Sequence, residues 1–353
     1  MINFIGFTRN KSDIKNAKNL IHKIFKGSEK QQNLILNNPD NINRNNLVIL
    51  EFNKKIIGVI RLVRKKSFNQ KILLKILGVS HVCISKRYRN KGYSKLLLNF
   101  AIKYGEKNKY DISLLFARKN VDKYYNKFGY FGVSSFPILT LQLIKKEYDF
   151  EKKLSIRDAK INDYTFLNQS YKSCYSRSNF LFKRSKKYWE YILEHSRLFK
   201  VDFKIILHRG KPILYVNYKQ NEIYEFGGIN IEHSAKFILH YLKMLVGKKI
   251  IFHVDPYHTF ISFINSEKSE FKIRNVIQGG HMIKILNKNK FNNNSKKILN
   301  IYNKFMSLKK NKYNLDLLSL CETIYYTNTK ILDYETPFLS RSKIVHFLRN
   351  DEF

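Results

Sequence analysis

Apolar residues recur with two spacings over the first half of the chain, one typical of helices and one typical of strands. Residues 14–25 and 93–104 place apolar side chains three and four positions apart, which predicts two amphipathic helices. Apolar runs of strand length, bounded by polar residues, predict strands at 2–7, 47–52, 56–63, 72–84 and 112–116. This order of helices and strands is typical of a mixed α/β sheet, and its length suits one domain over residues 1–148.

The segments between these elements complete the first predicted domain. Residues 28–45 are polar and rich in asparagine, and residues 64–70 are basic, so both are expected to form loops. A short helix is expected at 120–127, and a pair of apolar strands within 131–144 is expected to close the sheet. The highly charged stretch 145–153 is expected to be a linker.

A second α/β pattern begins at Leu154 and predicts another lobe over residues 149–288, followed by a tail over residues 289–353. Helices are expected at 161–174, from Arg184 onward and at 233–246. Strands are expected at 154–156, 203–207, 213–218, 223–226, 250–254 and 281–286.

One turn of the first domain is suited to binding an anion. It joins the strand that ends at Ile84 to the helix expected to start near Gly92, and it consists of Arg89, Asn90, Lys91, Gly92, Tyr93 and Ser94. The first turn of a helix has unpaired backbone N–H groups and a partial positive charge, and glycine lets another group approach the backbone closely. With the cations of Arg87, Arg89 and Lys91, this turn can cradle a pyrophosphate.

The turn resembles the R/Q-x-x-G-x-G/A loop of the GNAT N-acetyltransferases, and residues 124–130, YYNKFGY, resemble the later F-Y-x-K-x-G-F motif of that family. Ser94 stands where the family usually has Gly or Ala, and Lys86 where many members have Pro. The resemblance implies a catalytic GNAT domain over residues 1–148. It also implies acetyl-CoA as co-substrate, with the pyrophosphate on the loop and the pantetheine arm along the backbone of Val82, Cys83 and Ile84.

The same resemblance implies roles in the transfer of an acetyl group from the thioester to an amine. Tyr125 stands four residues before Gly129, where the family has the general acid that protonates the departing thiolate. A backbone N–H of the strand that contains Val82–Ile84 is the expected oxyanion donor. Two groups are candidates for the general base: His81, which titrates near neutrality, and the terminal carboxylate of Phe353. The alternative for both Tyr125 and His81 is a purely structural role.

The second lobe has no comparable phosphate loop, because Gly227 and Gly228 precede a helix without a basic residue. It is therefore expected to be a degenerate, non-catalytic GNAT-like lobe. The arrangement is similar to tandem-lobed acetyltransferases of the enhanced-intracellular-survival type, which implies that the second lobe shapes the acceptor pocket. The strings that carry this similarity are Arg184-Ser185-Lys186-Lys187-Tyr188-Trp189 and Gly279-Gly280-His281-Met282-Ile283.

Charge leaves two interpretations of the partner open. The 353 residues include 66 Lys+Arg and 27 Asp+Glu, a formal net charge of +39. This value favours a nucleic acid or an acidic membrane surface. However, the lysines are spread along the chain, and asparagine and isoleucine are abundant too, so a compositional bias is the favoured explanation.

Other sequence features restrict the class of protein. No run of 18 or more apolar residues predicts a membrane span, and the N-terminus lacks the layout of a signal peptide. The three cysteines are far apart, which fits a reducing compartment and a cytoplasmic protein. His253, Asp255 and His258 lie close together in sequence, but no fourth ligand is evident, and we expect no metal.

Together these features predict an acetyl-CoA-dependent N-acetyltransferase that acts on a primary amine of a small molecule, an amino sugar, a peptide or a protein. Two alternatives remain. One is a non-catalytic RNA- or surface-binding protein on a GNAT scaffold, and the other is a transferase that uses aminoacyl-tRNA. The sequence specifies neither the acceptor, nor the length of the acyl chain, nor the oligomeric state.

Overall fold

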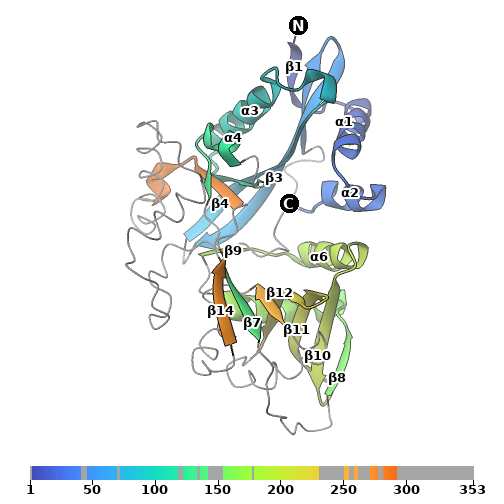
Figure 1. Cartoon of the computed structure of the whole chain (residues 1–353), viewed down its shortest axis with the longest axis vertical. Helices are drawn as coiled ribbons and strands as arrows, with labels where there is room; N and C mark the ends of the chain where they lie inside the picture. The colour runs from blue at the N-terminus through green and yellow to red at the C-terminus, as the bar shows by residue number, and fades with distance from the viewer. Residues whose placement is uncertain are drawn as a thin grey trace.

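The computed structural model describes eleven segments of the chain: residues 2–40, 46–69, 72–117, 122–132, 136–141, 154–176, 179–229, 250–253, 258–260, 271–276 and 281–291. The predicted linker, the predicted helix at 233–246 and the tail beyond residue 291, with Phe353, lie outside these segments. Within them the chain forms two sheets, one above the other in Figure 1.

The first sheet has eight strands, seven of them in the order β1-β2-β3-β4-β5-β15-β6, and β9 pairs with β3. Its pairs are antiparallel except β4 with β5, which is parallel. The strands are β1 Ile2–Phe7, β2 Leu47–Phe52, β3 Lys55–Asn69, β4 Ile72–Ile84, β5 Ile112–Phe116, β6 Phe131–Gly132, β9 Asn179–Phe182 and β15 His281–Ile285.

Helices cover both faces of this sheet (Figure 1): α1 (Lys11–Ile24) lies on one face, and α3 (Tyr93–Lys107) lies on the other. Strand β2 shows why its sequence is continuously apolar. Leu47 and Ile49 pack in the cluster that contains α1, whereas Val48 and Leu50 pack in the cluster that contains α3. A strand buried on both faces reads as an apolar run rather than as an alternation.

The second sheet has seven strands in the order β14-β7-β13-β12-β11-β10-β8. Helices α5 (Tyr164–Tyr175) and α6 (Lys186–Leu198) pack on it and contribute to its aromatic core around Trp189. A short 3-10 helix, η3 (Ile161–Asp163), directly precedes α5. The strands are β7 Phe136–Leu141, β8 Leu154–Asp158, β10 Asp202–His208, β11 Lys211–Lys219, β12 Glu222–Gly228, β13 Ile251–His253 and β14 Phe271–Val276.

The two sheets exchange strands, which corrects two expectations. Strand β7 was expected to close the first sheet, but it pairs with β13 and β14 in the second. Strand β15 was expected in the second lobe, but it lies between β5 and β6 in the first. A short apolar run indicates a strand and not the sheet that the strand joins. The domain limits at 148 and 288 stay predictions. Each sheet contains strands from both sides of residue 148, since β7 precedes it and belongs to the second sheet, and β15 follows it and belongs to the first.

Two expected loops are regular structure instead. Residues 28–45 include α2 (Glu29–Leu36), which begins with a capping box in which Ser28 and Gln31 satisfy each other's backbone N–H groups. Residues 64–70 were expected to be a basic loop, but β3 continues to Asn69. Lys65 and Ser67 are buried there, so this part of the strand alternates between buried and exposed positions.

Contacts of β3 and α2 with α6 hold the two sheets together. Lys65 of β3 donates a hydrogen bond to the Tyr188 hydroxyl of α6 and lies 3.3 Å from the Asp40 carboxylate. Gln31 donates to the carbonyl of Leu198 at the end of α6, over 3.0 Å.

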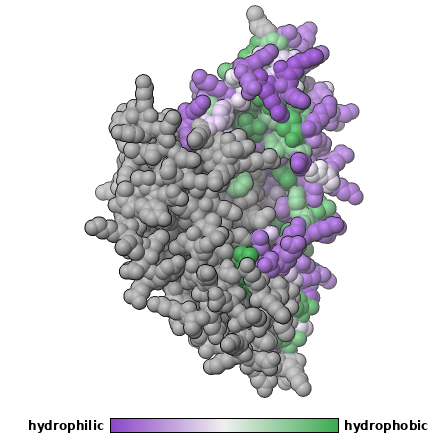
Figure 2. Space-filling view, in the orientation of Figure 1, coloured by the Kyte–Doolittle hydropathy of each residue, from purple (hydrophilic) through white to green (hydrophobic). Residues whose placement is uncertain are grey.

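Figure 2 shows hydrophilic side chains along the edge of the molecule where α1 and α2 lie. No helix in the described segments is long and apolar enough to cross a membrane.

Candidate active site

A bulge interrupts β4 beside the predicted cofactor strand. Val59 of β3 pairs with Cys83 and Arg61 pairs with Ser80, so two steps along β3 face three steps along β4. The extra residue changes the direction of the strand, and His81 takes a left-handed conformation with φ of 48°. Bulges of this kind re-aim backbone groups and are frequent next to active sites.

Strand β4 also extends past its partner β5. The parallel ladder runs from Ile76 with Ile112 to Val79 with Leu115, whereas β4 continues to Ile84. Within the described register, the last five residues of β4 therefore lie beyond the ladder with β5. This end of the strand can pair with an extended ligand through its backbone, as the resemblance requires of Val82, Cys83 and Ile84.

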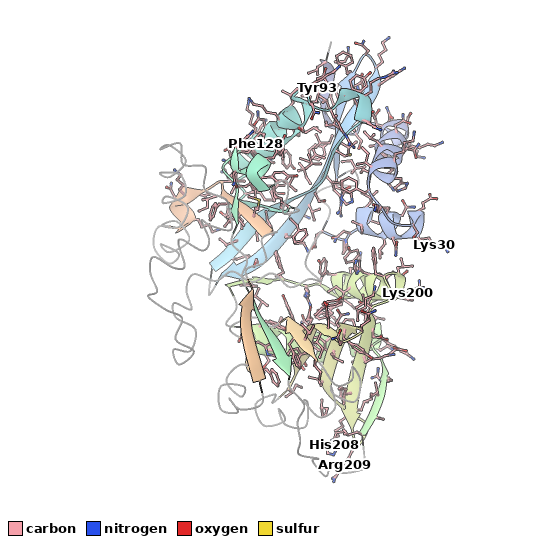
Figure 3. All side chains as sticks on the ribbon, viewed as in Figure 1. Lys30, Tyr93, Phe128, Lys200, His208 and Arg209 are labelled. Carbon is pink, nitrogen blue, oxygen red and sulfur yellow. The ribbon has the colours of Figure 1, made fainter. Side chains whose placement is uncertain are left out.

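The predicted phosphate loop follows the short 3-10 helix η1 (Lys86–Tyr88), which comes just after the end of β4, and leads into α3. Gly92 is the N-cap of α3 with φ of 78°, and a side-chain carbon added there would meet no atom within 4 Å. No side chain caps the first turn of this helix, which in Figure 3 starts at the labelled Tyr93. Arg89 donates from Nε to the carbonyl of Ile84 over 3.2 Å, which ties the loop to β4. The open space and the uncapped helix start fit the pyrophosphate of an acyl-CoA.

Charge and packing around this loop agree with that role. Lys86, Arg87, Arg89 and Lys91 are all exposed, and they place four basic side chains at or next to the loop. Beneath them the ring of Tyr93 packs against Phe52 and Tyr88, with centroids 6.0 and 6.3 Å away. The loop is thus a positively charged turn on an aromatic base.

Tyr125 lies on the short helix α4 (Asp122–Asn126), just before the labelled Phe128 of Figure 3. Its ring packs edge-on against those of Tyr124 and Tyr130, at centroid distances of 5.4 and 6.3 Å. The Tyr130 hydroxyl is 2.7 Å from Ser113 Oγ on β5, and the Tyr124 hydroxyl donates to Ser94 Oγ over 2.7 Å. These contacts connect the surroundings of Tyr125 to the start of α3 and to β5.

His81 and Cys83, near the end of the cofactor strand, are electrically neutral. Burial, with a smaller effect of the Arg61 cation, lowers the pKa of His81 to about 3, and its Nδ1 lies 3.1 Å from Ser80 Oγ. An imidazole with this pKa is a weak acceptor for the proton of an ammonium group. Burial raises the pKa of the Cys83 thiol to about 12, so this side chain is no thiolate nucleophile at neutral pH.

Sequence reasoning missed the charged residues between the two sheets. Arg61 is fully buried, and burial lowers its pKa to about 10, so it remains a cation at neutral pH. Tyr188 and Tyr191 of α6, together with Asp40, partly offset this effect. Arg61 and Lys65 lie four residues apart and so on one face of β3, a spacing that could have signalled them if the strand had been extended past residue 63.

Of the His253, Asp255 and His258 group considered as metal ligands, His258 lies in the second lobe. It is buried there, where its Nε2 lies 3.1 Å from the carbonyl oxygen of Phe226 and its Nδ1 accepts from the N–H of Phe260. Asp255 and Phe353 lie outside the described segments. Among the residues that the structure describes, no three potential ligands are close enough to hold a metal ion.

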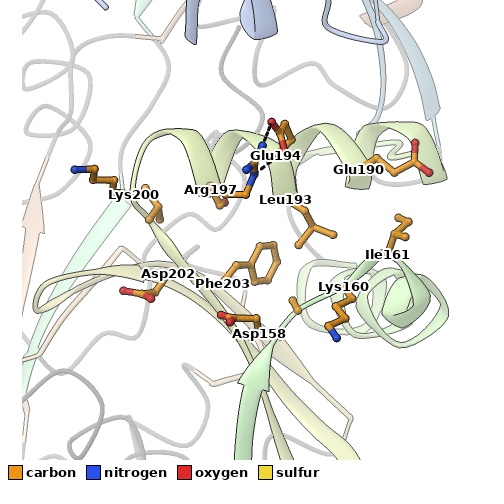
Figure 4. Close-up of a pocket in the computed structure, with 13 residues that line it drawn as sticks. Asp158, Lys160, Ile161, Glu190, Leu193, Glu194, Arg197, Lys200, Asp202 and Phe203 are labelled. Atoms are coloured by element: carbon orange, nitrogen blue, oxygen red, sulfur yellow. Dashed lines mark hydrogen bonds and ion pairs between the residues drawn. The ribbon is translucent and has the colours of Figure 1, made fainter. Parts of the chain in front are cut away.

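A cavity of about 670 Å³ lies in the second lobe, between α6, η3 and the start of β10 (Figure 4). Its wall combines apolar side chains such as Phe203 with charged ones of both signs, and Glu194 and Arg197 are joined by an ion pair of 2.6 Å. None of the residues predicted from the sequence lines it. We therefore place the candidate active site at the end of β4 and not at this cavity.

Comparison with known proteins agrees with this architecture. Residues 8–132 match a family model described as an acetyltransferase (GNAT) domain. A search of curated protein sequences finds no match. The GCN5-related N-acetyltransferase from Anabaena variabilis ATCC 29413 has a TM-score of 0.63 and 15% identity, over 81% of this chain and 74% of that one.

Two further solved structures share the fold over most of the chain. The GCN5-related N-acetyltransferase from Kribbella flavida has a TM-score of 0.60 and 12% identity, over 81% of this chain and 73% of that one. Eis1 from Mycobacterium abscessus has a TM-score of 0.57 and 11% identity, over 81% and 74%. Residues 8–132 are therefore similar to a GNAT acetyltransferase domain, and the chain has the α/β GNAT fold with a second mixed sheet added.

Proposed function

We propose that the protein is an acetyl-CoA-dependent N-acetyltransferase with one working site, at the end of β4. The supporting observation is that the bulged, over-extended end of β4 leads through η1 into the open Gly92 turn at the start of α3. Acetyl-CoA needs a strand backbone to pair with its pantetheine arm and an anion site for its pyrophosphate. The end of β4 and the Gly92 turn offer these two features close together.

In this proposal each residue has a defined task. The first turn of α3 and the cations of Arg89 and Lys91 bind the pyrophosphate, and a backbone N–H of Val82–Ile84 donates to the developing oxyanion. Tyr125 gives its phenolic proton to the leaving thiolate. A neutral phenol with a pKa near 10 and a thiol with a pKa near 8.5 are close enough for such a transfer.

The acceptor is a primary amine, which must be neutral when it attacks. His81 and the carboxylate of Phe353 are the two candidate bases. The low pKa of His81 favours a role for its neutral ring in lining the acceptor site, where it packs edge-on against Phe25 at 4.9 Å. Tyr191 and Tyr188 of α6 act on the charge of Arg61, and Arg61 acts on His81, so the second lobe approaches that side through Arg61.

Calorimetric titration with acetyl-CoA tests the proposal, with Gly92→Glu as the variant and Gly210→Glu as the matched control. Both glycines have positive φ, 78° and 76°, and open space at the added carbon, so both changes bring similar backbone strain and the same charge. Gly210 lies in the turn between β10 and β11. We expect saturable one-to-one binding by the wild type and the control, and at least about tenfold weaker binding by Gly92→Glu.

The opposite results would point elsewhere. Equal affinity of all three proteins would exclude the phosphate role of the loop. A wild type that does not bind acetyl-CoA would exclude the proposed function, and titration with RNA at two salt concentrations would then test the alternative, because affinity that rests on phosphate contacts falls steeply with salt.

The role of Tyr125 has its own test, once an amine screen has identified an acceptor. Tyr125→Phe removes the proton donor and keeps the ring, so we expect kcat to fall by about 100-fold while the affinity for acetyl-CoA stays unchanged. Full turnover by this variant would show that Tyr125 is a packing residue.

A further inference from the structure

Helix α4, which carries the proposed general acid, is too short to fix its own orientation. It spans the five residues Asp122–Asn126, and a single helical turn gains little stability from its own hydrogen bonds. The direction of the Tyr125 side chain must therefore depend on contacts with neighbouring elements. The question is which contacts hold this turn in place.

Two hydroxyl–hydroxyl hydrogen bonds of tyrosines whose rings contact Tyr125 provide those contacts. Tyr130, four residues after α4, is bound to Ser113 of β5, and Ser113 lies 3.3 Å from the carbonyl of Leu77 on β4. Tyr124, on α4 itself, donates to Ser94 of α3. The first bond anchors the segment that follows α4 to the sheet, and the second anchors α4 to the phosphate loop.

The bond to Ser94 has a defined direction. Burial raises the pKa of Tyr124, with a smaller opposing effect of the hydrogen bond to Ser94, so the phenol is protonated at neutral pH and acts as the donor. Ser94 accepts this proton with Oγ, and its own hydroxyl hydrogen remains to donate to another acceptor. Ser94 is the second residue of α3, in the uncapped turn proposed to hold the pyrophosphate.

We infer that Tyr124 and Ser94 are positioning residues that couple pyrophosphate binding to the orientation of Tyr125. This inference rests on the proposed function. The phosphate fixes the first turn of α3, Ser94 holds Tyr124, and Tyr124 packs edge-on against Tyr125 at 5.4 Å and Phe128 at 5.2 Å. A glycine or alanine at position 94 would have no hydroxyl to make this connection.

A mutant cycle with three substitutions tests the coupling, measured as kcat and as acetyl-CoA affinity. Tyr124→Phe removes one hydroxyl and keeps the ring, and Ser94→Ala removes its acceptor. We expect each to lower kcat about five- to tenfold, and the double variant to be no slower than either single one. In a Tyr125→Phe background, Tyr124→Phe should lower kcat no further, because it acts through Tyr125.

Two controls separate coupling from general damage. Ser94→Thr retains a hydroxyl and should retain at least half of the wild-type kcat. Tyr104→Phe removes the hydroxyl of a partly buried tyrosine further along α3, whose ring packs on Phe7 at 5.2 Å, and should leave kcat unchanged.

The possible failures are distinguishable. A wild type that neither binds nor turns over acetyl-CoA would refute the proposed function, and this inference with it. An active wild type with an unchanged Tyr124→Phe variant, with additive losses in the double variant, or with a further loss in the Tyr125→Phe background, would refute the coupling alone.

Discussion

The ion pair of Arg184 and Glu225 allows a quantitative test of how the second lobe is held together. Both side chains are 0% exposed, and Arg184 donates two hydrogen bonds to the carboxylate, over 2.7 and 2.9 Å. The Tyr215 hydroxyl donates to the same carboxylate over 2.9 Å. Glu225→Gln keeps the size and shape of this side chain and removes its charge.

The expected cost follows from the desolvation of the guanidinium. Removing one partner of a buried pair typically costs about 3–5 kcal/mol, because the remaining charge is left in a low-dielectric site. The rings of Tyr171 and Trp189 lie 4.0 and 4.8 Å from the Arg184 guanidinium and recover on the order of 1 kcal/mol by cation–π attraction. We therefore expect Glu225→Gln to lower the free energy of unfolding by about 3 kcal/mol.

Urea unfolding followed by tryptophan fluorescence measures this loss directly. Trp189 is the one tryptophan of the chain, is fully buried and lies against Arg184, so its emission reports on this site. The control is Glu194→Gln, which breaks a pair with Arg197 whose side chains are 40% and 73% exposed. Exposed pairs contribute at most about 1 kcal/mol, so the control should be nearly neutral.

The double variant Arg184→Met/Glu225→Leu completes the test. Replacing a buried pair by apolar side chains is often neutral or stabilising, so this variant should recover most of the stability that Glu225→Gln loses. If Glu225→Gln costs no more than Glu194→Gln, the assumption that desolvated charge dominates this site is wrong.

Three further predictions concern the whole chain. Burial lowers the pKa of His258 to about 4 from 6.5, so the unfolded chain binds the proton at a higher pH than the folded chain does. The free energy of unfolding should therefore fall as pH falls from 6.5 towards 4, by about 2 kcal/mol at pH 5. Urea unfolding of His258→Phe should show a shallower decline with pH. The high pKa and burial of Cys83 should protect it from iodoacetamide until the protein unfolds, as mass spectrometry of a Cys321→Ser variant would show; fast labelling at pH 7 would contradict this. A fragment of residues 1–148 should not fold alone, because it lacks β15, whereas co-expressed halves should associate; a cooperative thermal transition of the fragment would contradict this.

The parts of the site that the sequence predicted depend on local signals. The apolar run to Ile84, the basic turn and the helical stripe after Tyr93 are adjacent in the chain, and each can be recognised within about 15 residues. Gly92 has the positive φ that makes glycine informative at a helix start. The match of residues 8–132 to a GNAT domain model confirms the family resemblance, whereas the roles of the residues in this stretch stay predictions.

The parts that it did not predict depend on contacts between distant residues. The sequences of β7 and β15 do not indicate which sheet each strand joins. Each is a short apolar run that could pair with neighbours in either sheet. The bond between Ser94 and Tyr124 joins residues 30 positions apart, and Ser94 by itself was only a departure from a family pattern. Lys65 looked like part of a solvated loop because its neighbours, Arg64 and Lys66, are basic too. In the structure those two neighbours are exposed, whereas Lys65 is buried.

Strand β3 connects the second lobe to the end of β4 where we propose that transfer takes place. At one end β3 forms the ladder with the bulge of β4, where Arg61 pairs with Ser80, and at the other it pairs with β9, where Ser67 faces Phe182. Lys65 lies between these points and contacts Tyr188 of α6. Besides burial, the charge of Arg61 lowers the pKa of His81 at the bulge, and Tyr191 and Tyr188 of α6 in turn offset part of the burial effect that lowers the pKa of Arg61. The contact between α6 and β3 therefore gives the second lobe an electrostatic influence on the bulge beside the cofactor strand.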